Sequence, residues 1–97
     1  MDQHGKYTRK EVLSEIQNFL FGEISITSDE TKNKLVSLGE KADLINDYNS
    51  DLLDRVYVVM DLEEKLGIVL EDGDKYTTIK DVLDAVCKQL KKSGRLL

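Results

Sequence analysis

The residues that could carry covalent or metal chemistry in this chain are few and far apart in the sequence. There is one cysteine, Cys87, and one histidine, His4, among 97 residues. A structural zinc site needs four such ligands, and a Cys–His dyad needs both side chains in contact. We expect His4 to lie in a terminal tail and Cys87 to be a small core or boundary residue rather than a reactive thiol. The sequence therefore predicts neither a metal site nor an enzyme.

The acidic turn Asp72-Gly73-Asp74 contains residue types found in calcium-binding loops. A loop that begins at Asp72 would need Gly and Glu where this chain has Thr77 and Leu83. Carboxylate pairs elsewhere would need a pocket to act as an acid–base pair, and no glycine-rich phosphate loop is present. We therefore predict an ordinary turn at 72–74.

The charge of the chain is unevenly distributed. The formal net charge is -5, with 40% hydrophobic and 34% charged residues, which is typical of a folded globular chain. Residues 1–10 carry +2 and residues 88–97 carry +4, so residues 11–87 carry -11. Binding to phosphates requires an excess of Lys and Arg, so the acidic body argues against a nucleic-acid-binding function.

No segment of the sequence indicates a membrane or an export signal. Apolar runs stay far below the roughly 18 residues of a membrane-spanning helix, and the N-terminus lacks the apolar part of a signal peptide. A single cysteine cannot form an internal disulfide, so we expect a cytoplasmic protein without membrane insertion. At this length the chain is one domain, 1–97, with flexible tails expected at 1–7 and 93–97.

The spacing of apolar residues favours helices throughout. The chain has no proline and little alternation of apolar and polar residues, as expected of an all-α fold. A capping box of Thr8 and Glu11 predicts a first helix over 9–21, with Gly22 as its stop.

Two further helices are predicted from their caps. A short helix over about 29–38 follows Thr27 as the candidate N-cap. The last helix begins at Thr77 or Thr78, where Asp81 completes a capping box.

The helix expected over 51–66, capped by Ser50 or Asp51, has apolar residues on two neighbouring sides. Its five acids and two bases give it a net charge of -3. One arc of about 100° would face the core: Val58, Val59, Leu62 and Leu66. A second arc of about 140° includes the following residues: Leu52, Leu53, Val56, Tyr57, Met60, Glu63 and Glu64. Either the helix is buried on two sides, or the second arc forms a groove for a partner protein. The second interpretation leaves Glu63 and Glu64 exposed, and burial of these two charged side chains would be costly.

The most specific motif of the chain lies at the start of this helix. It consists of Asp51-Leu52-Leu53-Asp54, then Val56 and Val59-Met60, then the run 62–68. This pattern resembles the recognition helix of the acyl carrier protein family. The lead-in 44–47 and the segment 77–82 are similar to that family too, so the resemblance covers about 42–90. It implies a small four-helix bundle with a long first connection that carries an extra short helix.

The resemblance implies a cofactor that this sequence does not accommodate in the usual place. In the family, the serine of Asp-Ser-Leu holds a 4'-phosphopantetheine arm, whose thiol carries the acyl chain. Here that position is Leu52, which has no nucleophilic oxygen, so the arm is not expected there. Ser50 is the alternative attachment residue, but its use requires a two-residue slip, and a serine there is explained by N-capping.

The resemblance also implies a docking surface and its partners. The partner-binding residues would be Asp51, Leu53, Asp54, Val56, Tyr57, Met60, Glu63 and Glu64. We expect a monomer that binds basic surfaces of synthase or transferase enzymes, a phosphopantetheinyl transferase among them. Two hypotheses stay open: a carrier-type module of fatty acid or polyketide biosynthesis, or an interaction module that keeps the fold and is never phosphopantetheinylated.

Overall fold

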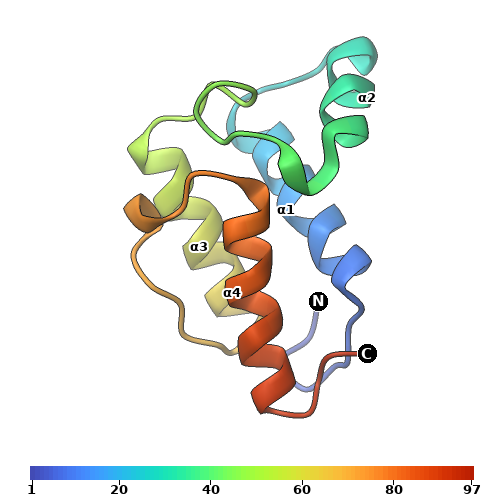
Figure 1. Ribbon diagram of the computed structural model, residues 1–97, viewed down its shortest axis with the longest axis vertical. Coiled ribbons are helices and arrows are strands. Elements are labelled where there is room, and N and C mark those ends of the chain that lie inside the picture. The colour runs from blue at the N-terminus through green and yellow to red at the C-terminus, as the bar shows by residue number, and fades with distance from the viewer.

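The computed structural model describes all residues from 1 to 97 and is built from helices alone (Figure 1). The helices are α1 (Arg9–Glu23), α2 (Asp29–Leu38), α3 (Leu52–Leu66) and α4 (Ile79–Lys92), with short 3₁₀ turns η1 (Gly39–Lys41) and η2 (Gly73–Lys75). The predicted all-α bundle of four helices is confirmed, including the extra short helix in the first connection. No helix has the length and apolar character needed to cross a membrane.

Three of the four helices begin with a capping box. In each box, the side chain of the N-cap residue accepts a hydrogen bond from the backbone N–H of the residue three positions later. The carboxylate of that second residue accepts a hydrogen bond from the backbone N–H of the N-cap residue. The pairs are Thr8 with Glu11, Asp51 with Asp54, and Thr78 with Asp81. The predicted caps of α1 and α4 are confirmed, and of the two candidates for α3 the structure selects Asp51.

The bounds predicted for the second helix are confirmed, but its predicted N-cap and the predicted end of the first helix are wrong. Ser28, not Thr27, caps α2, because its hydroxyl accepts from the Thr31 N–H at 3.3 Å. The first helix continues past Gly22 to Glu23, and the chain leaves the helical path at Ser25, whose φ is 59°. Gly22 is compatible with the helical conformation, so it did not have to act as the stop.

The core lies between α1, α3 and α4. The first helix, α1, packs against both α3 and α4, while α2 stands away at one end (Figure 1). The fully buried side chains come mainly from these three helices: Val12, Ile16, Leu20, Val58, Leu62, Leu66, Ile79, Val82, Leu83, Val86 and Leu90. The predicted core-facing arc of α3 is therefore confirmed, whereas α2 buries only Leu35.

The loop between η1 and α3 is fastened to the start of α4. The Leu44 N–H donates to the Thr77 carbonyl at 2.9 Å, and the Ile79 N–H donates to the Ala42 carbonyl at 3.0 Å. Tyr48 is buried and its ring stacks on Phe21. These contacts fix the position from which α3 begins.

The two chain ends, where we expected flexible tails, contact each other in the structure. The Tyr7 N–H donates to the Arg95 carbonyl at 2.9 Å, and the Leu97 N–H donates to the Tyr7 carbonyl at 2.8 Å. The Arg95 guanidinium donates to the carbonyls of Asp2, Gly5 and Leu66. The N and C labels accordingly lie close together in Figure 1.

Candidate functional site

Leu52 is the first residue of α3 and lies at the surface. Its side chain is 50% exposed. The Asp51–Asp54 capping box fixes the helix start, with hydrogen bonds of 2.8 and 2.9 Å between the two residues. The position at which the motif predicts attachment of an arm is therefore accessible, but its side chain contains no atom other than carbon and hydrogen.

Ser50 lies two residues earlier and has a different role from the one predicted. It is buried, and its hydroxyl donates to the Leu44 carbonyl, which also accepts from the Ser50 N–H at 3.0 Å. The Ser50 carbonyl accepts from Arg55 Nη1 at 3.2 Å. The explanation of Ser50 as an N-cap is thus wrong, because its hydroxyl closes the loop before α3 instead.

The second apolar arc of α3 faces solvent. Leu53, Tyr57 and Met60 are 58%, 43% and 55% exposed, and Val56 is half-buried. Of the acids around them, Asp51 and Glu64 are exposed, whereas Asp54 and Glu63 are partly buried. This exposure excludes the interpretation that α3 is a central helix buried on two sides. We call Leu53, Tyr57, Met60 and Glu64 the α3 stripe, since their spacing places them on one face.

A cavity of about 350 Å³ lies beside the α3 stripe, between α3 and η2. Its lining consists of Leu52, Val56, Val59, Met60, Glu63 and the segment 70–74. Gly73 packs directly on the α3 backbone, where a Cβ atom would lie 2.8 Å from the Arg55 carbonyl oxygen. The sequence indicated only an acidic turn at 72–74. The cavity could not be foreseen because it depends on how closely that turn approaches α3.

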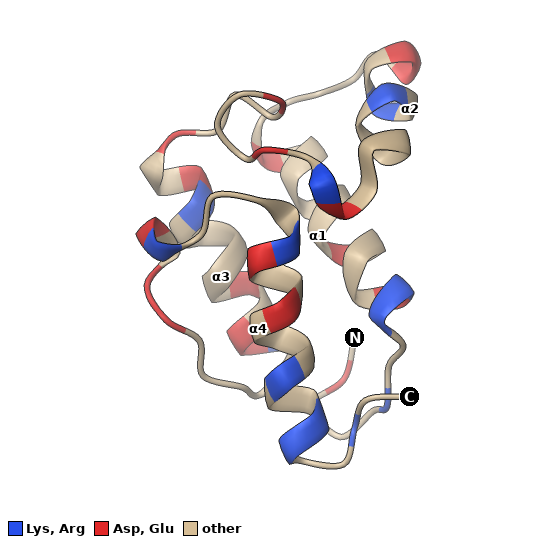
Figure 2. Ribbon diagram, in the orientation of Figure 1, with Lys and Arg blue, Asp and Glu red and all other residues tan.

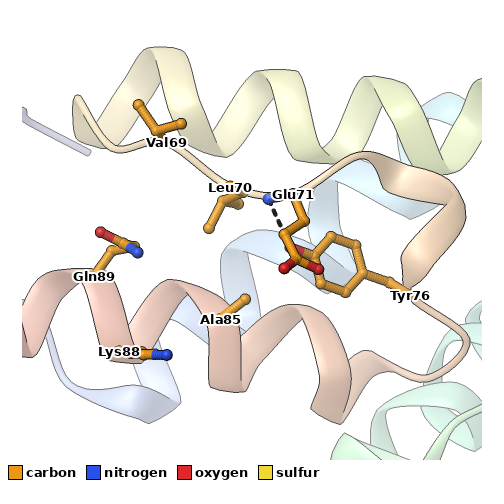
Figure 3. Close-up of a pocket in the computed structure, with 7 residues that line it drawn as sticks. All are labelled: Val69, Leu70, Glu71, Tyr76, Ala85, Lys88 and Gln89. Atoms are coloured by element: carbon orange, nitrogen blue, oxygen red, sulfur yellow. Dashed lines mark hydrogen bonds between the residues drawn. The ribbon is translucent and has the colours of Figure 1, made fainter.

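A second cavity, of about 410 Å³, lies on the other side of the segment 69–71, against α4 (Figure 3). Its lining residues are Val69, Leu70, Glu71, Tyr76, Ala85, Lys88 and Gln89. The Tyr76 hydroxyl accepts from the Glu71 N–H at 3.1 Å, and burial raises the pKa of Tyr76. Leu70 and Glu71 line both cavities, so this segment separates them.

Charge is unevenly distributed over the molecule (Figure 2). Lys and Arg gather at the C-terminal end of α4 and along the nearby chain ends, whereas carboxylates outnumber bases on α3 and η2 has Asp74 beside Lys75. On α3, Lys65 Nζ pairs with Glu15 at 2.6 Å and with Asp61 at 3.2 Å. Burial raises the pKa of Asp61, and the hydrogen bond to Glu15 raises the pKa of Lys65. Asp61, Lys65 and Glu64 line one pocket with the N-terminal residues 1–4, and none of the ion pairs includes Glu64.

Cys87 and His4 do not join the site. Cys87 is buried in the core, and burial raises the pKa of its thiol, which disfavours the reactive thiolate. The prediction of a small buried residue is therefore confirmed. His4 is exposed in the N-terminal segment.

Two of the relatives found by comparison with known proteins carry the name acyl carrier protein. The relative from Thermotoga maritima is 31% identical over 85 residues, which cover 86% of this chain and 96% of the relative. The chain belongs to the acyl carrier protein family. A second acyl carrier protein, from Campylobacter hominis, is 36% identical over 75 residues, or 75% of this chain and 86% of the relative. No family model matches.

The residues at the start of α3 do not fit the phosphopantetheine arm that the acyl carrier protein family implies. A phosphoester link needs a hydroxyl that can reach a modifying enzyme. The accessible side chain, Leu52, has no hydroxyl, and the hydroxyl of Ser50 is buried and donates to the Leu44 carbonyl. This acyl carrier protein fold therefore presents its helix start without a suitable attachment group.

Proposed function

We propose that this acyl carrier protein-type module binds enzymes of acyl-chain or related biosynthesis through the exposed face of α3, and that it does so without a phosphopantetheine arm. The observation that carries the proposal is the α3 stripe next to Leu52. Leu53, Tyr57 and Met60 expose a large apolar area beside carboxylates on a helix that is otherwise well packed. Exposed apolar groups rimmed by charge are typical of protein-binding surfaces. The module itself is not catalytic in this proposal.

The proposed partner has a basic surface with an apolar centre. The net charge of -3 over 51–66 favours a cationic partner. Charges at the rim of an interface speed association, and salt weakens this effect because it screens the electrostatic attraction. The apolar side chains of the stripe then supply the contact that persists when salt screens the charges. Synthase and transferase enzymes that recognise carrier proteins are the partner class we propose.

A second candidate function is an interaction module outside acyl-chain synthesis that keeps the fold alone. The buried hydroxyl of Ser50 and the alkyl side chain of Leu52 are compatible with both candidates, because neither residue offers a place for an acyl group. The two functions share the α3 stripe and differ in the identity of the enzyme or protein that binds it.

Direct binding to purified acyl-chain synthase and transferase enzymes tests the proposal. We expect the unmodified chain to bind at least one of them, with affinity that falls as salt rises. Glu64→Lys should weaken binding by about tenfold, because it places a like charge against the basic surface. Glu30→Lys is the matched control, since Glu30 is also exposed but lies on α2. Equal loss with both variants, or no binding to any enzyme of this class, contradicts the proposal.

A further inference from the structure

Two adjoining cavities form a groove along α4, on the side that faces the segment following α3. The cavity of about 410 Å³ shares two lining residues, Val69 and Gln89, with a further cavity of about 320 Å³. Apolar side chains line both: Leu70 and Ala85 in the larger cavity, and Ile68 in the smaller one. We call the two cavities together the α4 groove. None of its lining residues belongs to the α3 stripe.

The backbone along one wall of the α4 groove has unused hydrogen-bonding groups. The Ile68 and Leu70 N–H groups donate to the carbonyl and the carboxylate of Glu63. The Val69 N–H and the carbonyls of residues 68–70 have no hydrogen-bond partner within the protein. This stretch belongs to no helix or strand, and Figure 3 shows it passing alongside α4. A surface stretch with free N–H and carbonyl groups can pair with the backbone of an added peptide.

The charge of the α4 groove is positive, opposite in sign to that of α3. Lys88 and Lys92 lie one helical turn apart, are exposed, and take part in no ion pair. The guanidinium of Arg95 donates only to carbonyl groups, so no carboxylate balances its charge. Glu71 is the one acidic residue of the two linings. The groove therefore favours a ligand with carboxylates.

We infer that the α4 groove binds an extended segment of a partner protein in which apolar and acidic residues alternate. The backbone of that segment pairs with the free Val69 N–H and the neighbouring carbonyls. Because alternate side chains of an extended peptide point to opposite sides, the apolar ones contact Leu70 and Ala85. The carboxylates pair with Lys88 and Lys92 at the exposed rim, where a charge-assisted contact adds to the backbone bonds.

An alkyl carboxylate matches the α4 groove less well than a peptide does. Its chain would cover the apolar lining and its carboxylate would meet a lysine, but the free backbone groups would stay unpaired. The side-chain amide of Gln89, which makes no hydrogen bond within the protein, likewise offers a donor and an acceptor that match a peptide group. The inference is independent of the proposed function, since it concerns another surface and a partner of opposite charge.

Titration of the ¹⁵N-labelled chain with blocked five-residue peptides at constant ionic strength tests the inference. The main probe is acetyl-Val-Glu-Val-Glu-Val-amide, for which we expect saturable shifts of the amides of residues 68–71, Ala85 and Gln89. The peptide with Gln in place of Glu should bind about tenfold more weakly, and the one with Lys should give no saturable shift. Equal binding of the three peptides, or saturable shifts confined to other residues, overturns the inference.

Two further probes separate backbone pairing from simple burial of an apolar anion. The acidic peptide is N-methylated at its two glutamates in one version and at its three valines in the other, because alternate N–H groups of an extended peptide face opposite edges. At least one version should bind about tenfold more weakly than the parent peptide. Unchanged affinity of both versions, or tighter binding of octanoate than of the acidic peptide, overturns the inference.

Charge-neutral variants test whether the lysines of the α4 groove hold the carboxylates. Lys88→Gln with Lys92→Gln should weaken binding of the acidic peptide by about tenfold. Lys34→Gln with Lys41→Gln is the matched control, since it removes two exposed lysines that also form no ion pair but lie on α2 and η1. Equal loss in the two double variants, or no loss in the first with a native amide spectrum, contradicts the proposed site.

Discussion

At the scale of single residues, Leu52 is the position on which the proposed absence of the arm depends. Its side chain is half exposed at the first position of α3, so it contributes little to the core. We expect Leu52→Ser to lower the free energy of unfolding by less than about 1 kcal/mol, as surface substitutions do. Denaturant unfolding measures this directly. A loss of several kcal/mol would show that Leu52 fills the core and would contradict its assignment to the surface.

The role of Ser50 could not be predicted from the sequence. Ser50 and Asp51 are both good N-caps, so the sequence left the choice open. The structure gives the cap to Asp51 and buries the Ser50 hydroxyl against the Leu44 carbonyl, a contact that depends on the path of the preceding loop. Such a path follows from tertiary packing and has no local signal.

The buried hydroxyl of Ser50 leads to a stability prediction. Ser50→Ala removes the hydrogen bond to Leu44 while the backbone bond between the same residues stays, so we expect a loss of about 1 kcal/mol. Thermal or denaturant unfolding of the variant checks this value. An unchanged stability would indicate that the hydroxyl makes no useful contact inside the loop.

At the scale of elements, the close approach of η2 to α3 depends on Gly73. A Cβ at this position would lie 2.8 Å from both the Arg55 carbonyl oxygen and the Val56 nitrogen, which are backbone atoms that cannot rotate away. We expect Gly73→Ala to destabilise the fold by about 1–3 kcal/mol, as overpacking does, and to shift the amides of 70–74.

Gly22→Ala is the matched control for this prediction. Gly22 is inside α1 and has open space where the Cβ would be added, so alanine should leave stability unchanged or raise it by up to about 1 kcal/mol. Equal effects of the two substitutions in denaturant unfolding would contradict the packing of η2 on α3.

Helix boundaries illustrate how far the sequence predicts elements. The caps at Thr8 and Thr78 were predictable because both members of each capping box are local in sequence. Thr27 and Ser28 are adjacent residues with similar capping ability, so local rules could not choose between them. The cavity beside α3 was not predictable, since it forms between residues 52–63 and 70–74 that meet only in the fold.

At the scale of the whole molecule, an ion-pair network joins α1, η1 and α4. Arg9 donates to Glu40 and Asp84, and Lys80 pairs with Asp84 at 2.7 Å. Lys80 and then Arg9 hold the pKa of Asp84 below its ordinary value. A carboxylate whose pKa is lowered in the folded state stabilises the fold above its unfolded pKa and loses that contribution as pH falls through the folded value.

The free energy of unfolding should therefore lose a small contribution from this network as the pH falls into the acid range. We expect Asp84→Asn to lower the free energy of unfolding by no more than about 1 kcal/mol at pH 7, because Asp84 is well exposed to solvent. Well below about pH 4 the difference between variant and parent should shrink, since Asp84 is then protonated in both states. Unfolding curves at the two pH values check this. A difference that grows toward acid pH would contradict the sign of the pKa shift.

The whole molecule is also the scale of the central proposal, which is that this acyl carrier protein fold presents the start of α3 without a residue that can hold the arm. Intact mass after incubation with coenzyme A and a phosphopantetheinyl transferase tests it most directly. We predict no added mass on the parent chain, and added phosphopantetheine on Leu52→Ser, where a serine hydroxyl stands at the exposed start of α3. A stoichiometric arm on the parent chain that Ser50→Ala abolishes would contradict the account.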